Sequence, residues 1–256
     1  MEFLGTAVTD IGNKKKTNQD CVAIKVAQTD KGQVTFMILC DGMGGLEKGE
    51  VASATVLSEF CNWFEKRFPV LLDNNITMDR LKDEWGNMVQ RLNKKIGEYG
   101  EKNSLKLGTT LTAILILQEQ YYIVHVGDSR CYEIQEESLA ILTKDQTFVA
   151  REIELGRMTP EEAMKDSRRN MLLQCVGASK IVEPQFIQGD VKKDTVYMLC
   201  SDGFRHLITE KEIVMLIGPS KAKDVSSLKD GMQKLVEMNK NRNETDNISV
   251  VAVRTF

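Results

Sequence analysis

Four aspartates in this chain stand directly beside apolar runs that have the character of buried strands. A strand end is rigid, so a carboxylate placed there is held in a fixed geometry. Two of the four are followed by glycine, which lets the backbone approach a neighbour closely and leaves a carbonyl free to face an ion. The four are Asp41 after VTFMILC, Asp128 after YYIVHVG, Asp202 after TVYMLCS, and Asp246, which with Asn247 precedes ISVVAV.

Carboxylates that converge in one place repel each other, and bound divalent cations relieve that repulsion. Hard oxygen ligands select Mg²⁺ or Mn²⁺. Two such ions roughly 3.5–4 Å apart can share a bridging hydroxide, an arrangement suited to attack on a phosphate ester. The chain has only two histidines, and none of its six cysteines forms a C-x-x-C pair, so a zinc site is not expected. Any bound metal must therefore be held mainly by carboxylates.

Other interpretations of the same residues stay open at this point. Asp-Gly is also the commonest signal for a hairpin turn. The run DGMGG at 41–45 is more informative, since it places three glycines in five residues at a strand-to-helix junction. It could cradle a phosphate without any metal. It is not a P-loop, because no Gly-Lys-Ser/Thr follows.

Length and charge exclude several classes of protein. The 256 residues suit one large domain or two small ones. A net charge of −3 argues against non-specific binding of nucleic acid. The longest apolar runs, such as 113–117, are far shorter than the roughly 20 residues of a membrane span. Charges follow the apolar stretch at the N-terminus, so no signal peptide is expected, and the cysteines are interpreted as reduced thiols of a cytoplasmic protein.

Hydrophobic periodicity predicts an α+β domain rather than a regular βαβ alternation. One helix is expected after Gly44-Gly45 and is expected to close at Pro69, and a polar segment of helical character is expected over 147–170. The predicted strands are 22–27, 34–40, 110–117, 121–126, 130–134, 139–142, 195–200 and 248–253, and the predicted helices are 51–68, 81–99, 210–217 and 222–238.

Six short motifs, in order along the chain, are similar to those of a known family. They are KKTNQD at 15–20, DGMGG at 41–45, GTT at 108–110, GDSR at 127–130, SDGF at 201–204 and TDN at 245–247. With these motifs the chain resembles the protein phosphatase 2C family, the metal-dependent Ser/Thr phosphatases, and it looks like a compact bacterial member. The resemblance runs from about Gly5 to Val253, nearly the whole chain.

The resemblance implies a fold and an activity. The fold would be a central antiparallel β-sandwich flanked on both sides by helices, a single catalytic domain over 1–256, with a flap at about 147–170 beside a metal cleft. The activity would be hydrolysis of phosphoserine and phosphothreonine in proteins by a hydroxide held between two Mn²⁺ or Mg²⁺ ions, with no phosphoenzyme intermediate. Phosphoproteins and a cognate Ser/Thr kinase are the implied partners, with neither nucleic acid nor membrane involved, and the protein is expected to be a monomer.

The resemblance also implies a role for each site residue. Asp41 would bridge the two ions, Gly42 would offer its carbonyl to one of them, and Asp20 would act at the same site, through water. The other implied metal ligands are Asp202 and Asp246 at the second ion and Asp128 at a third, weaker ion. The implied catalytic set is Lys15, Asp20 and Asn247, the last positioning waters or the substrate phosphate.

Several positions depart from the family pattern. Lys15 stands where an arginine usually grips the substrate phosphate, and a lysine cannot form the bidentate fork, so weaker phosphate binding is predicted unless Lys14 or Lys16 helps. Met43 replaces a histidine that protonates the leaving group in animal relatives. The other departures are Asp145-Gln146 for Asp-His and Asp166-Ser167 for His-Pro in the flap.

Two further functions remain as alternatives. The chain could be a catalytically weak or inactive relative that binds and regulates a phosphoprotein partner, or a phosphatase dedicated to one regulatory protein, such as a phosphorylated anti-sigma antagonist. Outside the motifs, His125 is expected to be a hydrogen-bonded core or edge histidine and His206 a solvated loop residue. Cys40 and Cys200 are expected to be buried as small hydrophobic side chains.

Overall fold

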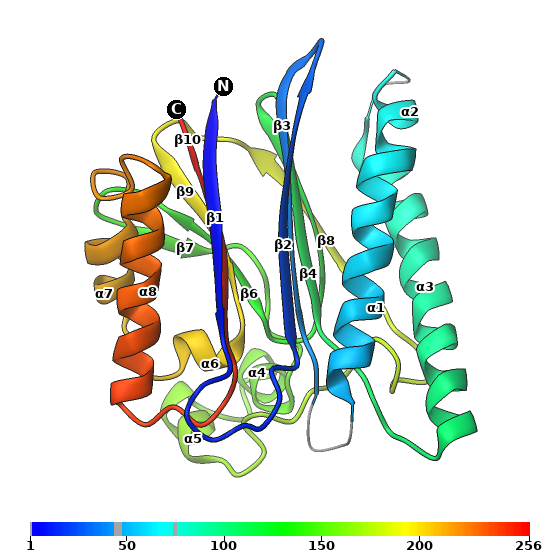
Figure 1. Cartoon of the computed structure of the whole chain (residues 1–256). Coiled ribbons are helices and arrows are strands. Elements are labelled where there is room, and N and C mark those ends of the chain that lie inside the picture. Colours follow the sequence, from blue (N-terminus) through cyan, green and yellow to red (C-terminus); the bar gives the residue numbers. More distant parts are fainter. Residues whose placement is uncertain (1, 44–47, 74–75) are drawn as a thin grey trace.

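Two five-stranded antiparallel sheets pack face to face in the computed structural model, which describes residues 2–43, 48–73 and 76–256 (Figure 1). The first sheet has the order β1 (Phe3–Asp10), β10 (Ile248–Thr255), β9 (Thr195–Cys200), β6 (Arg130–Ile134) and β7 (Leu139–Ile141). The second has the order β2 (Asp20–Thr29), β3 (Gly32–Asp41), β4 (Leu111–Leu117), β5 (Gln120–Val126) and β8 (Gln185–Asp190).

Helices cover the outer face of each sheet (Figure 1). The second sheet is covered by α1 (Gly49–Asn62), η1 (Trp63–Arg67), α2 (Phe68–Leu72) and α3 (Met78–Asn103). The first sheet is covered by α6 (Asp202–Arg205), α7 (Glu210–Ile217) and α8 (Val225–Asn241). The chain therefore has the predicted sandwich flanked on both sides by helices.

The central strands are apolar on both faces because each face meets a separate core layer. In β3, Phe36 and Ile38 pack toward the helices, while Met37 and Leu39 pack into the layer between the sheets. A strand buried on both sides reads as an unbroken apolar run, since successive side chains point to opposite faces. This explains why VTFMILC shows no polar alternation.

The first long helix does not end at Pro69, so that prediction is wrong. A π-helical stretch, η1, follows α1, and α2 then continues to Leu72 with Pro69 in its first turn. Proline is tolerated there because the first backbone N–H groups of a helix have no partner within it. The ring of Trp63 lies 5.8 Å from Phe68 and 5.3 Å from Trp85, which holds this segment against α3. Gly44 and Gly45, where the helix was expected to begin, lie outside the described residues.

Two strands were not predicted. Strand β1, FLGTAVTD, pairs along its length with β10, and Gly5 lies against the side chain of Ile24 in the sandwich interior. Strand β8, QFIQGD, pairs only with β5 at the edge of its sheet. Both strands contain polar and apolar residues and are stabilised by a partner strand that is distant in the sequence. A local sequence pattern does not predict such pairing.

The segment 147–170 contains two short helices, α4 (Phe148–Glu154) and α5 (Pro160–Lys165). Thr147 caps α4, and Thr159 and Glu162 form a capping box on α5. The guanidinium of Arg168 lies 4.1 Å from the centre of the Phe148 ring and so ties the end of the segment to its start. Figure 1 shows α4, α5 and α6 at the end of the sandwich opposite the N and C labels. Among the described helices, none combines the length and apolarity that crossing a bilayer requires.

Candidate metal centre

Strand pairing brings the predicted acids to one end of the sandwich. Asp20 opens β2 directly opposite Asp41, which closes β3. Asp202 follows β9 and Asp246 precedes β10, and these two strands pair with each other. Asp128 lies in the turn between β5 and β6, next to the same strand ends. The five carboxylates are close enough for Asp41 to be affected electrostatically by the four others.

The backbone of Asp41 is fixed by the GTT motif. Its N–H donates to the hydroxyl of Thr110 (2.9 Å), and its carbonyl accepts from the Thr110 N–H (2.9 Å) and the Thr109 hydroxyl (3.0 Å). The Thr110 hydroxyl also contacts that of Ser129, at 2.8 Å, in the GDSR motif. The carboxylate of Asp41 therefore projects from a strand end that three motifs hold in place.

Two glycines let the motif backbones approach each other. A Cβ on Gly42 would lie 2.5 Å from the carbonyl oxygens of Gln19 and Gly49, and one on Gly203 would lie 2.2 Å from that of Asn247. Real Cβ atoms do not approach oxygen so closely, so only glycine fits at either position. Gly42 thereby packs the KKTNQD segment against the end of β3, and Gly203 packs the SDGF segment against TDN.

Three of the acids at this centre, Asp20, Asp41 and Asp128, have raised pKa values. Burial, with the charges of Asp202 and Asp246, raises the pKa of Asp20 to about 7. Burial and the neighbouring carboxylates raise the pKa of Asp41 well above its usual range. Burial and Asp202 likewise raise the pKa of Asp128 to about 7, although Arg205 acts in the opposite direction. The fold thus gathers negative charge that its own cations do not fully balance.

The residues present fit divalent cations with oxygen ligands. Asp20 Oδ2 is buried and has no hydrogen-bond partner, which is the state of an oxygen left for a cation. Carboxylate and carbonyl oxygens, such as those of the acids and of Gly42, are the ligands that Mn²⁺ and Mg²⁺ prefer. Within 2–43, 48–73 and 76–256, no three His, Cys, Asp or Glu side chains are arranged to hold a metal ion together as they stand. The acids lie at the same end of the sandwich, but their side-chain oxygens do not converge on one position.

Lys15 lies inside this group of acids. Its Nζ is 2.7 Å from Asp246 Oδ1, and the two side chains are 32% and 36% exposed. Burial opposes the charge, but the hydrogen bond to Asp246 and the charges of Asp41 and Asp202 raise the pKa of the Lys15 ammonium. The lysine predicted to meet the substrate phosphate therefore binds a predicted metal ligand.

Asn247 anchors the loop that carries Lys15. Its Oδ1 accepts from the Gln19 N–H (2.9 Å), and its Nδ2 donates to the carbonyls of Ile11 (2.9 Å) and Thr17 (3.2 Å). Its predicted contact with waters or phosphate stays a prediction, whereas this tethering function is visible directly. The TDN motif alone did not indicate it, because the partners are backbone groups far away in the sequence.

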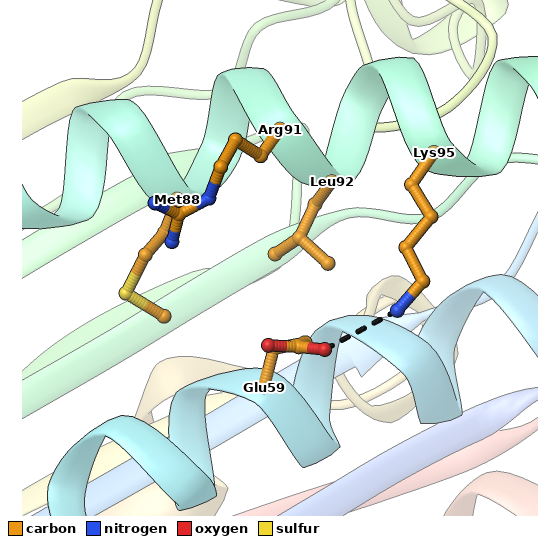
Figure 2. Close-up of a pocket in the computed structure, with 5 residues that line it drawn as sticks. All are labelled: Glu59, Met88, Arg91, Leu92 and Lys95. Carbon is orange, nitrogen blue, oxygen red and sulfur yellow. Dashed lines mark hydrogen bonds and ion pairs between the residues drawn. The ribbon is translucent and has the colours of Figure 1, made fainter.

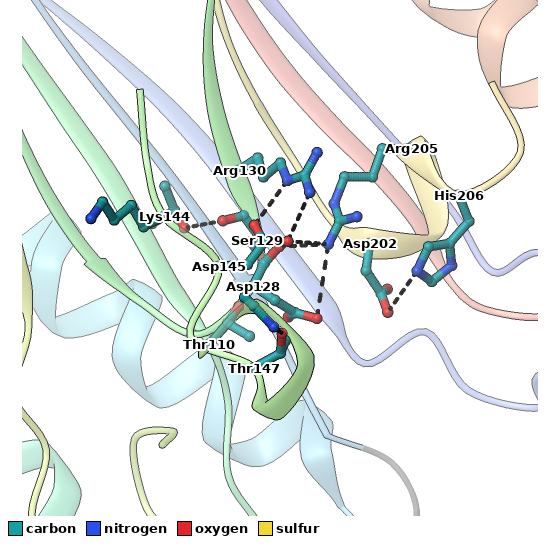
Figure 3. Close-up of polar contacts among 12 residues, drawn as sticks. Thr110, Asp128, Ser129, Arg130, Lys144, Asp145, Thr147, Asp202, Arg205 and His206 are labelled. Carbon is teal, nitrogen blue, oxygen red and sulfur yellow. Dashed lines mark hydrogen bonds and ion pairs between the residues drawn. The ribbon is translucent and has the colours of Figure 1, made fainter. Parts of the chain in front are cut away.

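An arginine-flanked acid beside the centre was missed by sequence reasoning (Figure 3). Arg130 makes two hydrogen bonds of 2.8 Å to the oxygens of Asp145. Arg205 Nη2 lies 3.4 Å from Asp145 Oδ2 and donates to the Asp128 carbonyl at 3.0 Å. Arg130 ends the GDSR motif and Arg205 directly follows SDGF, while Asp145 was noted only as part of the departure Asp145-Gln146.

His206, which was expected to be a solvated loop residue, contacts two acids near the centre. The residue is exposed, yet its ring lies 3.6 Å from both Asp202 Oδ2 and Glu244 Oε2. Burial opposes protonation, but Glu244 and Asp202 together raise the pKa of His206. Glu244 in turn accepts from the N–H of Asp246 at 3.0 Å, so it orders the TDN segment.

A pocket of about 450 Å³ lies between the centre and the 147–170 segment. Asp128, Arg205 and His206 contribute one side, and Val149 and Arg169 are among the residues of the other. A separate groove of about 290 Å³ between α1 and α3 contains none of the predicted site residues (Figure 2). Its lining consists of Glu59, Met88, Arg91, Leu92 and Lys95.

The remaining singled-out residues are structural. His125 is fully buried, with Nδ1 2.9 Å from the Thr112 hydroxyl and Nε2 3.1 Å from the Lys144 carbonyl, as expected for a core histidine. Cys40 and Cys200 are buried and unpaired, as expected. None of these three belongs to the group of acids.

Comparison with known proteins agrees with this geometry. A sequence profile described as Protein phosphatase 2C matches residues 12–243. A "Putative protein phosphatase 2C-type" of Streptococcus pyogenes is 30% identical over 247 residues, covering 96% of this chain and 94% of its own.

Solved structures give the same result. The serine/threonine phosphatase of S. agalactiae has a TM-score of 0.86 at 27% identity, with 100% of both chains covered. The catalytic domain of the serine/threonine protein phosphatase PstP, solved with two manganese ions, has a TM-score of 0.77 at 29% identity, covering 98% of this chain and 97% of that one. Sequence profile, relatives, fold and gathered acids all agree, and the chain belongs to the protein phosphatase 2C family.

Proposed function

We propose that this chain is a metal-dependent protein phosphatase that hydrolyses phosphoserine and phosphothreonine in proteins. The observation that carries the proposal is the convergence of five aspartates at one end of the sandwich, with a buried Asp20 oxygen left without a partner. Relatives with similar sequences are named as serine/threonine phosphatases, and the fold is the same over nearly the whole chain.

Each acid has a distinct task in this proposal. Asp41 and the Gly42 carbonyl would hold the first Mn²⁺ or Mg²⁺ ion, and Asp41 would share the second with Asp202 and Asp246. When bound, these ions supply Lewis-acid stabilisation of the phosphoryl oxygens and lower the pKa of a nucleophilic water. Asp20 would accept a hydrogen bond from that water, because its oxygen is buried beside Asp41 and lacks another partner.

The remaining groups would bind and orient the substrate. Lys15 would contact the phosphate as a single-point charge, which predicts weaker binding than an arginine would give. Met43 cannot donate a proton, so a water at the metal centre is the candidate acid for the leaving group. Asp128 would support a third, weaker ion. Residues 147–170 would act as the flap, since they form one side of the pocket that adjoins Asp128.

The physiological setting is also a proposal. The chain would act as a single catalytic domain and a monomer in the cytoplasm, on phosphoproteins whose phosphates come from a Ser/Thr kinase. Its cysteines are all free thiols, which is typical of a reducing compartment. No feature of the described residues favours the inactive alternative.

One experiment tests the proposal directly. Phosphatase activity is measured on phosphoserine, phosphothreonine and phosphotyrosine peptides in Mn²⁺, Mg²⁺, Ca²⁺ or chelator. We expect turnover of the first two substrates with Mn²⁺ or Mg²⁺, and none after chelation. Equal turnover with and without chelator would disprove the metal-dependent assignment, and metal binding without turnover would favour the regulatory alternative.

A further inference from the structure

The ammonium of Lys15 pairs with an acid that is proposed to bind a metal ion. Its ammonium is 2.7 Å from Asp246 Oδ1 and is attracted further by Asp41 and Asp202. All three acids belong to the set assigned above to the metal ions. Lys15 therefore brings a positive charge into a group of acids whose negative charge is otherwise poorly balanced.

The loop that carries Lys15 is attached to Asp246 through the backbone. Gly12, in the same loop, lies so close that a Cβ there would be 2.2 Å from the Asp246 carbonyl oxygen. The Asn247 amide ties the loop at Ile11 and Thr17. The reach of the lysine to Asp246 is thus set by the packing of the β1–β2 loop against the TDN segment.

We propose that Lys15 is an internal counter-ion of the metal centre that exchanges partners. It neutralises Asp246 while that carboxylate has no divalent cation, and it is released to the substrate phosphate when a cation binds Asp246. The inference rests on the proposed function and extends it, because one lysine then makes phosphate binding dependent on metal loading.

The chemistry of lysine suits such an exchange. Lysine is a single-point charge on a flexible four-carbon stem, whereas an arginine would hold a carboxylate with a rigid two-pronged fork. The Lys15 side chain is about a third exposed, at 32%, so its ammonium has a path into solvent and toward a bound phosphate. A partly exposed ion pair is also weak enough to be displaced by a divalent ion.

Competition for Asp246 has a measurable consequence. If Lys15 must leave before the ion binds, removing its charge tightens metal binding. A partly exposed ion pair is worth at most about 1 kcal/mol, which corresponds to roughly fivefold in affinity. The same change removes a phosphate contact, so inorganic phosphate should inhibit the metal-loaded variant less strongly than the wild type.

The test compares Lys15→Met with wild type after chelator treatment, using calorimetric titration with Mn²⁺. We expect the Mn²⁺ dissociation constant to fall, by up to about fivefold. We also expect a higher inhibition constant for inorganic phosphate, and a lower midpoint of thermal unfolding without metal. Lys15→Arg retains the charge and should not bind Mn²⁺ more tightly than wild type.

Lys25→Met is the matched control. Lys25 also makes a 2.7 Å ion pair, with Glu65, but on the surface of β2 and away from the acids. Its Mn²⁺ affinity should equal that of wild type. Equal Mn²⁺ affinity in wild type and Lys15→Met, or equal tightening in Lys25→Met, overturns the inference while leaving the proposed function intact. Absence of both Mn²⁺ binding and turnover in wild type would overturn both.

Discussion

Two half-buried acids at the same end of the sandwich, Asp145 and Asp41, have their pKa values shifted in opposite directions. Asp145 receives two hydrogen bonds from Arg130 and the charge of Arg205, which overcome burial and lower its pKa. Among the described residues, Asp41 has four other carboxylates near it and only the charge of Lys15 to offset them, and its pKa is raised well above the usual range. At Asp145 the protein's own arginines balance the negative charge. At Asp41 most of the balancing charge would have to come from bound cations. This is the difference that we expect between a structural acid and a proposed metal ligand.

The largest expected effect comes from Asp41→Asn. This change removes the charge shared by both ions, so we expect activity to fall by about 10³-fold or more, as when key transition-state electrostatics are lost. The fold should not suffer, because the neighbouring acids lose a repulsive partner. Activity with Mn²⁺ and urea unfolding without metal are the two measurements. Near-normal turnover would show that Asp41 is no ligand and that the comparison with Asp145 is mistaken.

Asp145→Asn should instead lower the free energy of unfolding. It leaves two arginines without their buried partner, which typically costs about 3 kcal/mol of unfolding free energy. Urea unfolding measures the loss, and Asp194→Asn is the control, because Asp194 pairs with Arg254 at 3.2 Å but is 74% exposed. The control should lose less than about 0.5 kcal/mol. If the two variants proved equally stable, the Arg130–Asp145–Arg205 cluster would not be structural.

Metal addition should stabilise the chain through the Asp41 group. Mn²⁺ at a hundred times its dissociation constant should raise the unfolding free energy by about 2.7 kcal/mol. Asp202→Asn should lose most of this gain while keeping the stability of the metal-free protein. Thermal unfolding with and without chelator makes the measurement. A gain retained in full by Asp202→Asn would remove Asp202 from the ligand set.

The smallest effect concerns His125, a buried group with neither counter-charge nor metal. Burial lowers its pKa to about 4, although Asp145 opposes the shift. The unfolded chain therefore binds more protons between about pH 6.5 and 4, so stability is present above that window and is lost as pH falls through it. From pH 7.5 to 5 this loss is about 2 kcal/mol.

His125→Gln should remove that loss. Asp20, Asp41 and Asp128 have raised pKa values and change stability in the opposite direction, so the useful quantity is the difference between wild type and variant at each pH. Urea unfolding of the metal-free proteins at pH 7.5 and 5 provides it. A difference that does not change with pH would mean that His125 is protonated in the fold.

The sequence contained the strands that carry the acids, because each is a compact apolar run ending in aspartate. Strand β9 matches its predicted bounds for that reason, and strand β6 and helix α7 also match theirs. The network around Asp145 and the bridge from His206 to Glu244 were not predicted, since they join residues up to 77 positions apart. The extension of the helix past Pro69 depends on a π-helical turn and on ring contacts with α3, which periodicity does not encode.

The anchoring of Gln19 by Asn247 also has a consequence for biosynthesis. These residues are 228 positions apart, and β1 pairs with β10 along its whole length. Contacts between such distant segments form late and slowly, because the loop entropy is lost before the contacts stabilise anything. A ribosome-bound chain still lacking the TDN segment can have most of the second sheet but not the lysine-bearing loop in place. The acid group can therefore assemble only after the TDN segment and β10 have been synthesised and can pair with β1.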